Sequence, residues 1–357
     1  SYQTLLNLSE SLQKTQQLNK YVSVCFLVDS IFDWLRDKHI GKTSDSMVEY
    51  LLDNCEKNVT ELEIWIPIAE TYIQSKFDIG KITLVPISKE VLNQWADQSA
   101  ENAEFVRRHQ KKLQGLTAAT IKLLAEPQRA AEIAIEEAEK AISILRIFHP
   151  ANLDPRSVSY WTPLGKENME YMTYYVVQGD RLISMTEKML DNSGNCILCN
   201  NSISLIKRYG LDILSDLLRQ DDKTHTQFQA QLLDSIYLYS RNSLAKDAAD
   251  KLVYILVALE SILLKNQNEP IQQNISDRMA LFIGTNQDEK LIIAKNVKDV
   301  YSLRSAFIHH GHSIKDIECL STFMDYTWTF FRLAIQNVNK FDNKIDFIDS
   351  IDKRKYS

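Results

Sequence analysis

Glycine and proline are scarce in this chain, with 9 glycines and 7 prolines among 357 residues. Both residue types interrupt regular structure and form tight turns, so their scarcity predicts long helices and argues against an all-β architecture. Hydrophobic residues make up 45% of the sequence, which at this length is enough to fill two packed cores. The composition therefore predicts a mainly helical protein.

Long apolar runs are also missing. The longest, over residues 252–264, is interrupted by Glu260 and Ser261 and is too short to span a bilayer. No charged segment followed by an apolar one opens the chain, although it begins at Ser1 without a methionine, which leaves room for a missing upstream piece. The five cysteines are an odd number spread along the sequence, as in proteins of a reducing compartment. We expect a cytoplasmic protein that makes no membrane contact.

An excess of positive charge is absent, because the net charge is -6. Proteins that coat nucleic acid are usually basic, since neutralised phosphates supply most of their affinity. Any RNA contact should therefore be local and transient, and no DNA binding is expected. Cys196 and Cys199 form a lone C-x2-C pair without further ligands nearby, and no glycine-rich phosphate loop is present, so we expect no metal and no cofactor.

Residues 1–215 mix helical patterns with strand candidates and predict an α+β domain with a small sheet. Strands are expected at 62–68, at the sheet edge because of Pro67, and at 82–87, followed by a helix capped by Ser88. Residues 102–146 contain mostly good helix formers and predict helix, with a break at Pro127. A hairpin is expected from 171–177 and 181–185, with Gly179 and Asp180 in its turn.

Residues 216–340 read as helices throughout and predict a helical bundle, followed by a polar, frayed tail over 341–357. The segment 245–265 is apolar on nearly every side at its centre and should be the buried helix. Ser276 is expected to cap a short helix that Gly284 ends. Residues 288–310 form one long helix or two stacked ones, and the aromatic-rich segment 317–338 forms the last.

The segment Leu303–His312 holds the sharpest candidate site. One interpretation is purely structural: Gly311 closes a helix, and histidines in the last turn interact with its exposed carbonyl groups. The functional interpretation uses Arg304 to hold a phosphate and His309 to move a proton near neutral pH. Residues five apart point about 140° away from each other on an ideal helix. Either the helix end is distorted, or a second copy of the chain completes the site across a two-fold axis.

Arg304 to His309 resembles the Arg-x4-6-His motif of HEPN domains, and the following His310-Gly311 is similar to the ending found in the Apea-like HEPN branch. The apolar segment 258–264 with its embedded Glu260 and the segment 276–284 with Arg278 also resemble this branch. The resemblance covers roughly residues 225–340. It implies a homodimeric helical bundle with the motifs paired at the interface, and a metal-independent endoribonuclease such as a toxin or an antiviral defence effector.

The resemblance also implies roles for single residues. His309 would be the general acid or base, Arg304 would hold the scissile phosphate, and His310 would assist or replace His309. Ser305 departs from the family, because active members often carry Asn, Asp or His there. The alternative is therefore a catalytically inactive HEPN module that binds RNA or protein partners. The N-terminal domain would sense a trigger, select the RNA or restrain the nuclease.

Glu260 needs a partner if it is buried in its apolar helix. We expect it to lie within hydrogen-bonding reach of Arg278 or Arg304 and to orient Arg304. The alternative is that Glu260 points to a helix end and is solvated.

Overall fold

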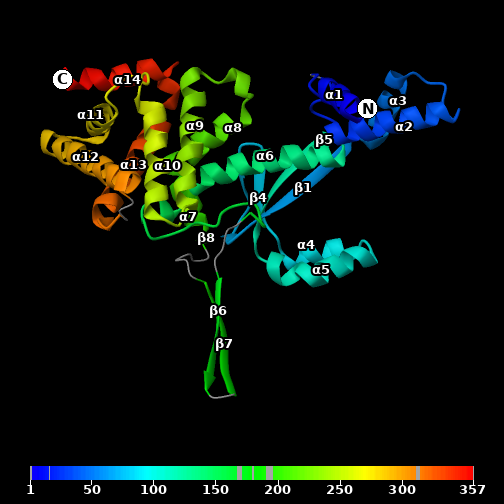
Figure 1. The fold of residues 1–357 in the computed structure, drawn as a ribbon, viewed down its shortest axis with the longest axis horizontal. Helices are drawn as coiled ribbons and strands as arrows, with labels where there is room; N and C mark the ends of the chain where they lie inside the picture. The colour runs from blue at the N-terminus through cyan, green and yellow to red at the C-terminus, as the bar shows by residue number, and fades with distance from the viewer. Residues whose placement is uncertain are drawn as a thin grey trace. The chain divides into compact units, whose positions relative to one another are not determined.

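The computed structural model describes residues 2–15, 17–166, 171–178, 181–189, 196–310 and 314–356 (Figure 1). Over these ranges the protein is mainly α-helical, with a small four-stranded antiparallel sheet in the N-terminal region, as the sequence predicts. Contacts between residues group the chain into two compact units. The first is Ser1–Pro67 with Ala118–Ala138, and the second is Ile68–Thr117 with Glu139–Ser357. The sequence-based boundary at residue 215, between two domains expected to fold independently, stays a prediction.

The first unit contains the N-terminal helices, whose apolar faces enclose a small core. Its buried members are Val22, Leu27, Ile31 and Leu51. Ser46 begins the third helix with a capping box, in which Ser46 and Glu49 each accept a hydrogen bond from the other's backbone N–H. The helices are α1 (Tyr2–Gln13), α2 (Val24–His39) and α3 (Met47–Asn58).

The sheet has the strand order β1-β5-β4-β3. Its strands are β1 (Thr60–Ile68), β3 (Phe77–Ile79), β4 (Ile82–Pro86) and β5 (Thr117–Ala125). Strand β1 lies at the edge, as Pro67 predicts, because proline lacks the N–H that an interior strand donates. Strands β3 and β4 form a tight antiparallel pair in which Ile79 lies opposite Ile82.

Strand β5 corrects the sequence-based prediction, which placed helix over residues 102–146. Helix α5 (Ala100–Leu113) ends before β5, and α6 (Pro127–Arg146) begins after it. The first five residues of β5 are all buried, so both faces of the strand are covered. A central strand with two covered faces shows no alternation, and its alanines make it look helical. Pro127 begins α6, since the first helical position tolerates a missing N–H.

The Glu126 carboxylate accepts hydrogen bonds from the N-terminal ends of two helices, α2 and α6. Its Oε1 accepts hydrogen bonds from the backbone N–H of Ser23 at 3.0 Å and of Arg129 at 2.9 Å. Its Oε2 accepts from the backbone N–H of Gln128 at 2.8 Å. The carboxylate is almost fully buried, yet these donors compensate its desolvation. Glu126 therefore caps α6 and fixes the residue before α2.

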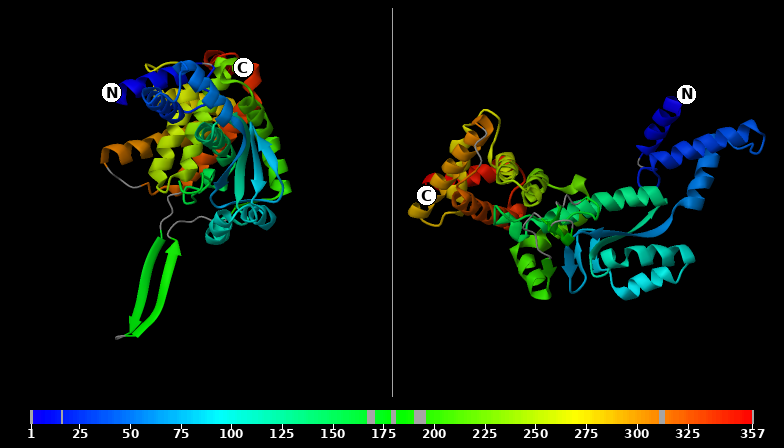
Figure 2. Two further views of the ribbon diagram at one scale, coloured as in Figure 1. Left: turned by 90° about the vertical axis from the view of Figure 1, so that its right-hand side faces the viewer. Right: turned by 60° about the horizontal axis from the view of Figure 1, so that its bottom comes forward.

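The N-terminal part of the second unit contains a helical pair and two further strand pairs. Ser88 caps α4 (Lys89–Ala96), as predicted, and α4 packs against α5 (Figure 1). Strands β6 (Tyr171–Gln178) and β7 (Arg181–Met189) form the predicted antiparallel hairpin (Figure 2). The expected turn residues, Gly179 and Asp180, lie outside the described residues. Strand β2 (Thr71–Ile73) pairs in parallel with β8 (Cys196–Leu198).

The rest of the second unit is a set of packed helices with an aromatic core. Phe347 contacts the rings of Phe228, Phe282 and Phe330. Two short 3-10 helices, η1 (Pro150–Asn152) and η4 (Arg241–Leu244), connect longer elements. The α-helices are α7 (Asn200–Ile206), α8 (Asp212–Arg219), α9 (Gln227–Ser240), α10 (Ala248–Leu263), α11 (Ile271–Ile283), α12 (Gln287–His310), α13 (Ile317–Gln336) and α14 (Lys344–Asp352).

Two predictions about these helices are wrong. Ser276 does not begin a helix: α11 already starts at Ile271, and the Ser276 hydroxyl donates to the Gln273 carbonyl within it. Residues 341–357, expected as a frayed tail, instead contain α14. Its Phe347, Ile348 and Ile351 are fully buried, and apolar burial of this kind outweighs the polar composition of the segment. Within the described ranges, no helix has both the length and the apolar character needed to cross a membrane.

Candidate functional site

Arg304 continues the buried face of α12. Ile293, Val297 and Val300 are buried at helical spacing on that face, and Arg304 occupies the next position of the same stripe. Arg304 is half-buried, and its Nε lies buried without a hydrogen-bond partner among the described residues. Helix α12 thus holds a guanidinium beside apolar core residues, with no ion pair to it in the described part of the chain.

Tyr301, one turn before Arg304, is the hydrogen-bond partner of Glu260. The Tyr301 hydroxyl donates to Glu260 Oε1 at 3.0 Å, which links α12 to α10. Burial and then the charge of Glu260 raise the pKa of Tyr301, while the charge of Arg304 opposes the shift. Glu260 is half-buried, and no arginine donates to it among the described residues. The expected arginine partner of Glu260 is therefore replaced by a neutral phenol.

Arg278 is fully engaged elsewhere. Its Nη1 donates to the Leu263 carbonyl at 2.6 Å and to Glu269 Oε2 at 2.8 Å. Its Nη2 donates to Glu269 Oε1 at 2.8 Å and to Asp352 Oδ2 at 3.2 Å, and its Nε donates to Asp352 Oδ1 at 3.0 Å. A guanidinium has five N–H donors, and these contacts use all of them. Arg278 therefore cannot pair with Glu260; it ties the end of α10 to α14.

The histidines of the motif follow on the same helix. Helix α12 extends to His310, but the side chains of His309 and His310, and residues Gly311 and His312, lie outside what the structure describes. Ser302 and Ser305 are exposed on α12. Helical spacing places position 309 on the same face as these serines and about 140° from Arg304. In a regular helix, positions 304 and 309 therefore lie on different faces of α12, as the sequence predicts.

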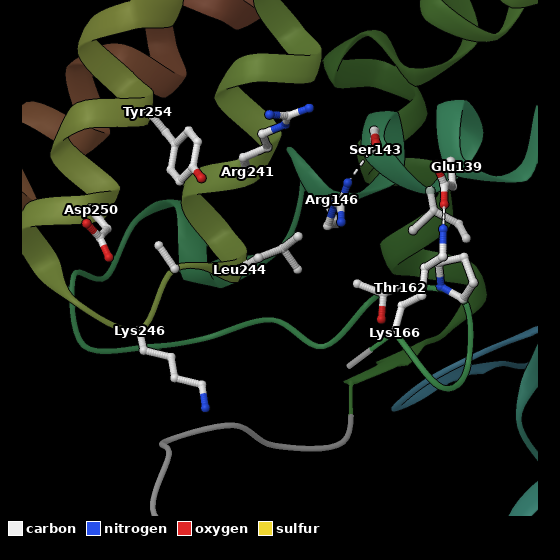
Figure 3. A pocket seen from close by; sticks show the side chains of 13 residues that line it. Glu139, Ser143, Arg146, Thr162, Lys166, Arg241, Leu244, Lys246, Asp250 and Tyr254 are labelled. Carbon is white, nitrogen blue, oxygen red and sulfur yellow. Dashed lines mark hydrogen bonds and ion pairs between the residues drawn. The ribbon is translucent and has the colours of Figure 1, made fainter. Parts of the chain in front are cut away.

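Four cationic side chains line a pocket of ≈ 660 Å³ in the second unit (Figure 3). They are Arg146, Lys166, Arg241 and Lys246. Arg146, on α6, lies at the centre of the residues drawn, with Arg241 and Tyr254 to one side and Glu139 and Lys166 to the other. Lys166 forms an ion pair with Glu139. The remaining charged groups in the lining are Lys246 and Asp250.

Arg146 is 7% exposed, and its hydrogen bonds involve only neutral groups. Its Nη2 donates to Ser143 Oγ at 2.6 Å and its Nη1 to the Trp161 carbonyl at 3.3 Å. Its Nε is buried and has no partner among the described residues. Burial lowers the pKa of Arg146 to about 10; the charge of Glu139 counteracts this effect and that of Arg241 adds to it.

A buried polar network supports the segments beside this pocket. Asn152 Nδ2 donates to the Arg146 carbonyl at 2.5 Å, and Asn242 Nδ2 donates to Asn152 Oδ1 at 2.8 Å. Lys251 Nζ donates to the Asn242 carbonyl at 3.0 Å, and burial lowers its pKa to about 8. His149 Nδ1 accepts from the Ala151 N–H at 3.0 Å. The network fixes η1 and η4, the second of which carries Arg241.

No sequence pattern singles out the pocket residues. Arg146 and Arg241 belong to elements far apart in the chain, and neither lies in a recognisable motif. One signal was present: Arg146 follows the mostly apolar segment 141–145 and precedes Ile147 and Phe148. An arginine is rarely buried among apolar residues unless its charge has a partner.

The C-x2-C pair lies at a strand end. Cys196 belongs to β8, and Cys199 occupies the position before α7. Cys199 Sγ lies 3.1 Å from Ser202 Oγ, a hydrogen bond that lowers the pKa of this thiol. In the described part of the chain, no group of three or more His, Cys, Asp or Glu side chains is arranged to hold a metal ion.

No family model, curated protein or solved structure matches this chain. The HEPN resemblance therefore depends on the residues of α10, α11 and α12 themselves.

Proposed function

We propose that the protein is a metal-independent endoribonuclease of the HEPN type, acting as a toxin or an antiviral defence effector. His309 takes the proton of an RNA 2′-hydroxyl, and the freed oxygen attacks the adjacent phosphorus. The bond to the 5′-oxygen breaks, and a histidine returns a proton to that leaving group. Arg304 binds the phosphate oxygens on which negative charge accumulates. The products are a 2′,3′-cyclic phosphate and a 5′-hydroxyl.

The observation that carries this proposal is the contrast between Arg304 and Arg278. Arg278 uses all its donors on Glu269, Asp352 and a carbonyl group. Arg304 has a buried Nε donor without a partner among the described residues. An unpaired buried donor is costly, so its retention favours a role for the guanidinium beyond structure. An anionic phosphate is the ligand that a planar fork of donors binds best.

The geometry of α12 supports a site shared by two protomers. Arg304 belongs to the buried stripe, whereas position 309 shares the helix face of the exposed Ser302 and Ser305. Lys295 and Lys298 lie on that same face, about four and about three turns before position 309. A two-fold axis beside the end of α12 would bring Arg304 and His309 of both copies around one cleft. The lysines would then supply local positive charge on a protein that is acidic overall.

The test is cleavage of total RNA by the purified protein in EDTA, with cell extract or phage components added as possible triggers. His309→Ala should remove cleavage, and Arg304→Lys should impair it strongly, because lysine cannot form a bidentate contact. His39→Ala, which changes an exposed histidine of α2, is the matched control and should cleave normally. Products should carry the cyclic phosphate, and DNA should survive because it lacks the 2′-hydroxyl.

Two results would contradict the proposed function. Cleavage that requires an added divalent metal would exclude the Arg–His mechanism. RNA or protein binding without cleavage under every condition would favour the inactive HEPN module, to which Ser305 already points.

A further inference from the structure

The pocket around Arg146 has the properties of an anion site. Arg146 is almost fully buried, and its Nε lacks a partner among the described residues. Arg241 lines the same pocket, and in the described part of the chain its side chain forms no hydrogen bond or ion pair. The two guanidinium groups lie close enough for the charge of Arg241 to disfavour that of Arg146. A bound anion would relieve both this repulsion and the unsatisfied donor.

The other lining residues restrict the kind of anion. The carboxylate of Asp250 and the ring of Tyr254 lie on the side of the pocket away from Lys166 (Figure 3). A carboxylate repels a second phosphate but accepts hydrogen bonds from sugar hydroxyls, and an aromatic ring can stack on a base. Ile142, Leu244 and Pro163 add apolar surface. The volume of ≈ 660 Å³ lies within the range of small-molecule sites.

We propose that this pocket binds a nucleoside phosphate, with the phosphate on Arg146 and Arg241, the ribose hydroxyls at Asp250 and the base against Tyr254. The site is independent of the proposed nuclease centre: its residues lie on α6, η4, α10, the link between η4 and α10, and the segment 162–166, and none belongs to α12. It gives the chain a small-molecule ligand in addition to any RNA substrate.

Isothermal titration calorimetry on the 357-residue chain tests this site without any assay of RNA cleavage. AMP should bind, whereas adenosine, which lacks the phosphate, should bind at least about tenfold more weakly. Inorganic phosphate should also bind more weakly than AMP, because it lacks the nucleoside contacts. Equal binding of adenosine and AMP would overturn the phosphate anchor, and equal binding of phosphate and AMP would overturn the nucleoside assignment.

Variants locate the site. Arg241→Gln should weaken AMP binding about tenfold or more, since it removes a charged donor on an exposed side chain and leaves the core intact. Tyr254→Ala should weaken it and Tyr254→Phe should preserve it if the ring stacks on the base. Arg107→Gln, on the exposed surface of α5, is the matched control and should bind normally. Arg146→Met would test the buried arginine, but it also removes bonds to Ser143 and Trp161, so folding must be checked by circular dichroism.

Three results would contradict the proposal. The first is an absence of AMP binding at millimolar concentrations. The second is binding that both Arg241→Gln and Tyr254→Ala leave unchanged. The third is displacement of AMP by a 5′-phosphorylated oligoribonucleotide that binds more tightly, which would make the pocket part of an RNA site. None of these outcomes depends on whether Arg304 and His309 cleave RNA.

Discussion

The Tyr301 hydroxyl donates a hydrogen bond of 3.0 Å to Glu260 Oε1 and so joins α12 to α10 one turn before Arg304. This pair satisfies a half-buried carboxylate in an otherwise apolar helix. It also places a negative charge near Arg304, whose own charge acts on Tyr301. The alignment of the motif helix therefore depends on a phenol–carboxylate contact between α10 and α12.

Tyr301→Phe should destabilise the protein by about 1–3 kcal/mol, because it leaves Glu260 without its donor while keeping the ring. Urea unfolding followed by circular dichroism measures the change. Tyr2→Phe removes a hydroxyl from a side chain that is 70% exposed and should be neutral. In a double-mutant cycle with Glu260→Gln, additive effects would show that the two side chains do not interact in solution.

Arg278→Lys should cost about 3 kcal/mol, because lysine cannot replace a guanidinium that uses all five donors on Glu269, Asp352 and the Leu263 carbonyl. Arg219→Lys, at an exposed ion pair with Asp216, is the matched control and should change stability by less than about 1 kcal/mol. Equal losses in both variants would contradict the structural role assigned to Arg278.

The same cluster should make the protein sensitive to acid. Hydrogen bonds from Arg278 lower the pKa of Glu269; for Asp352, burial acts in the opposite direction, but bonds from Arg278 and Lys265 lower its pKa overall. Groups with a depressed folded pKa stabilise the protein above their unfolded pKa, and this stability is lost as pH falls through the folded pKa. The loss should begin below about pH 4.5 and should be smaller in Arg278→Lys, as urea unfolding at several pH values can measure.

Sequence patterns predicted most of the helices because apolar spacing and caps are local signals. Ser88 begins its helix as expected, and the hairpin of β6 and β7 follows from β-rich segments around Gly179 and Asp180. Strand β5 was missed because its burial on both faces comes from neighbouring strands, which single-sequence periodicity does not contain. Helix α14 was missed because the burial of Phe347, Ile348 and Ile351 in a charged segment becomes evident only once the bundle is known.

The candidate site was predictable only in part. The Arg304-to-His309 motif and its separation on one helix follow from the sequence and from helix geometry. The partner of Glu260 did not, because Tyr301 and Arg304 lie one turn apart on α12 and an arginine is the more familiar partner for a carboxylate. The pocket around Arg146 also escaped prediction, since it unites α6, η4 and α10, which only the tertiary fold brings together.

His149 should add a separate acid-dependent loss of stability. Burial, and then the charge of Lys251, lower the pKa of His149 to about 4. Between about pH 6.5 and pH 4 the His149 imidazole binds a proton in the unfolded chain but stays neutral in the folded protein. The free energy of unfolding therefore falls as pH falls. His149→Asn keeps an acceptor for the Ala151 N–H without titrating, and its free energy of unfolding should depend less on pH in this window. His39→Asn, at an exposed position, should retain the wild-type slope.

If the nuclease site combines Arg304 of one protomer with His309 of its partner, two inactive variants should restore each other. Arg304→Ala and His309→Ala proteins, unfolded together and refolded, would form about half heterodimers. Each heterodimer would contain one site with both changes and one intact site, so the mixture should recover about a quarter of wild-type cleavage. Each variant refolded alone should stay inactive, and light scattering should show a dimer at micromolar concentrations for wild type and both variants. A site built within one chain gives no recovery in the mixture, and a monomer in light scattering would exclude the shared site altogether.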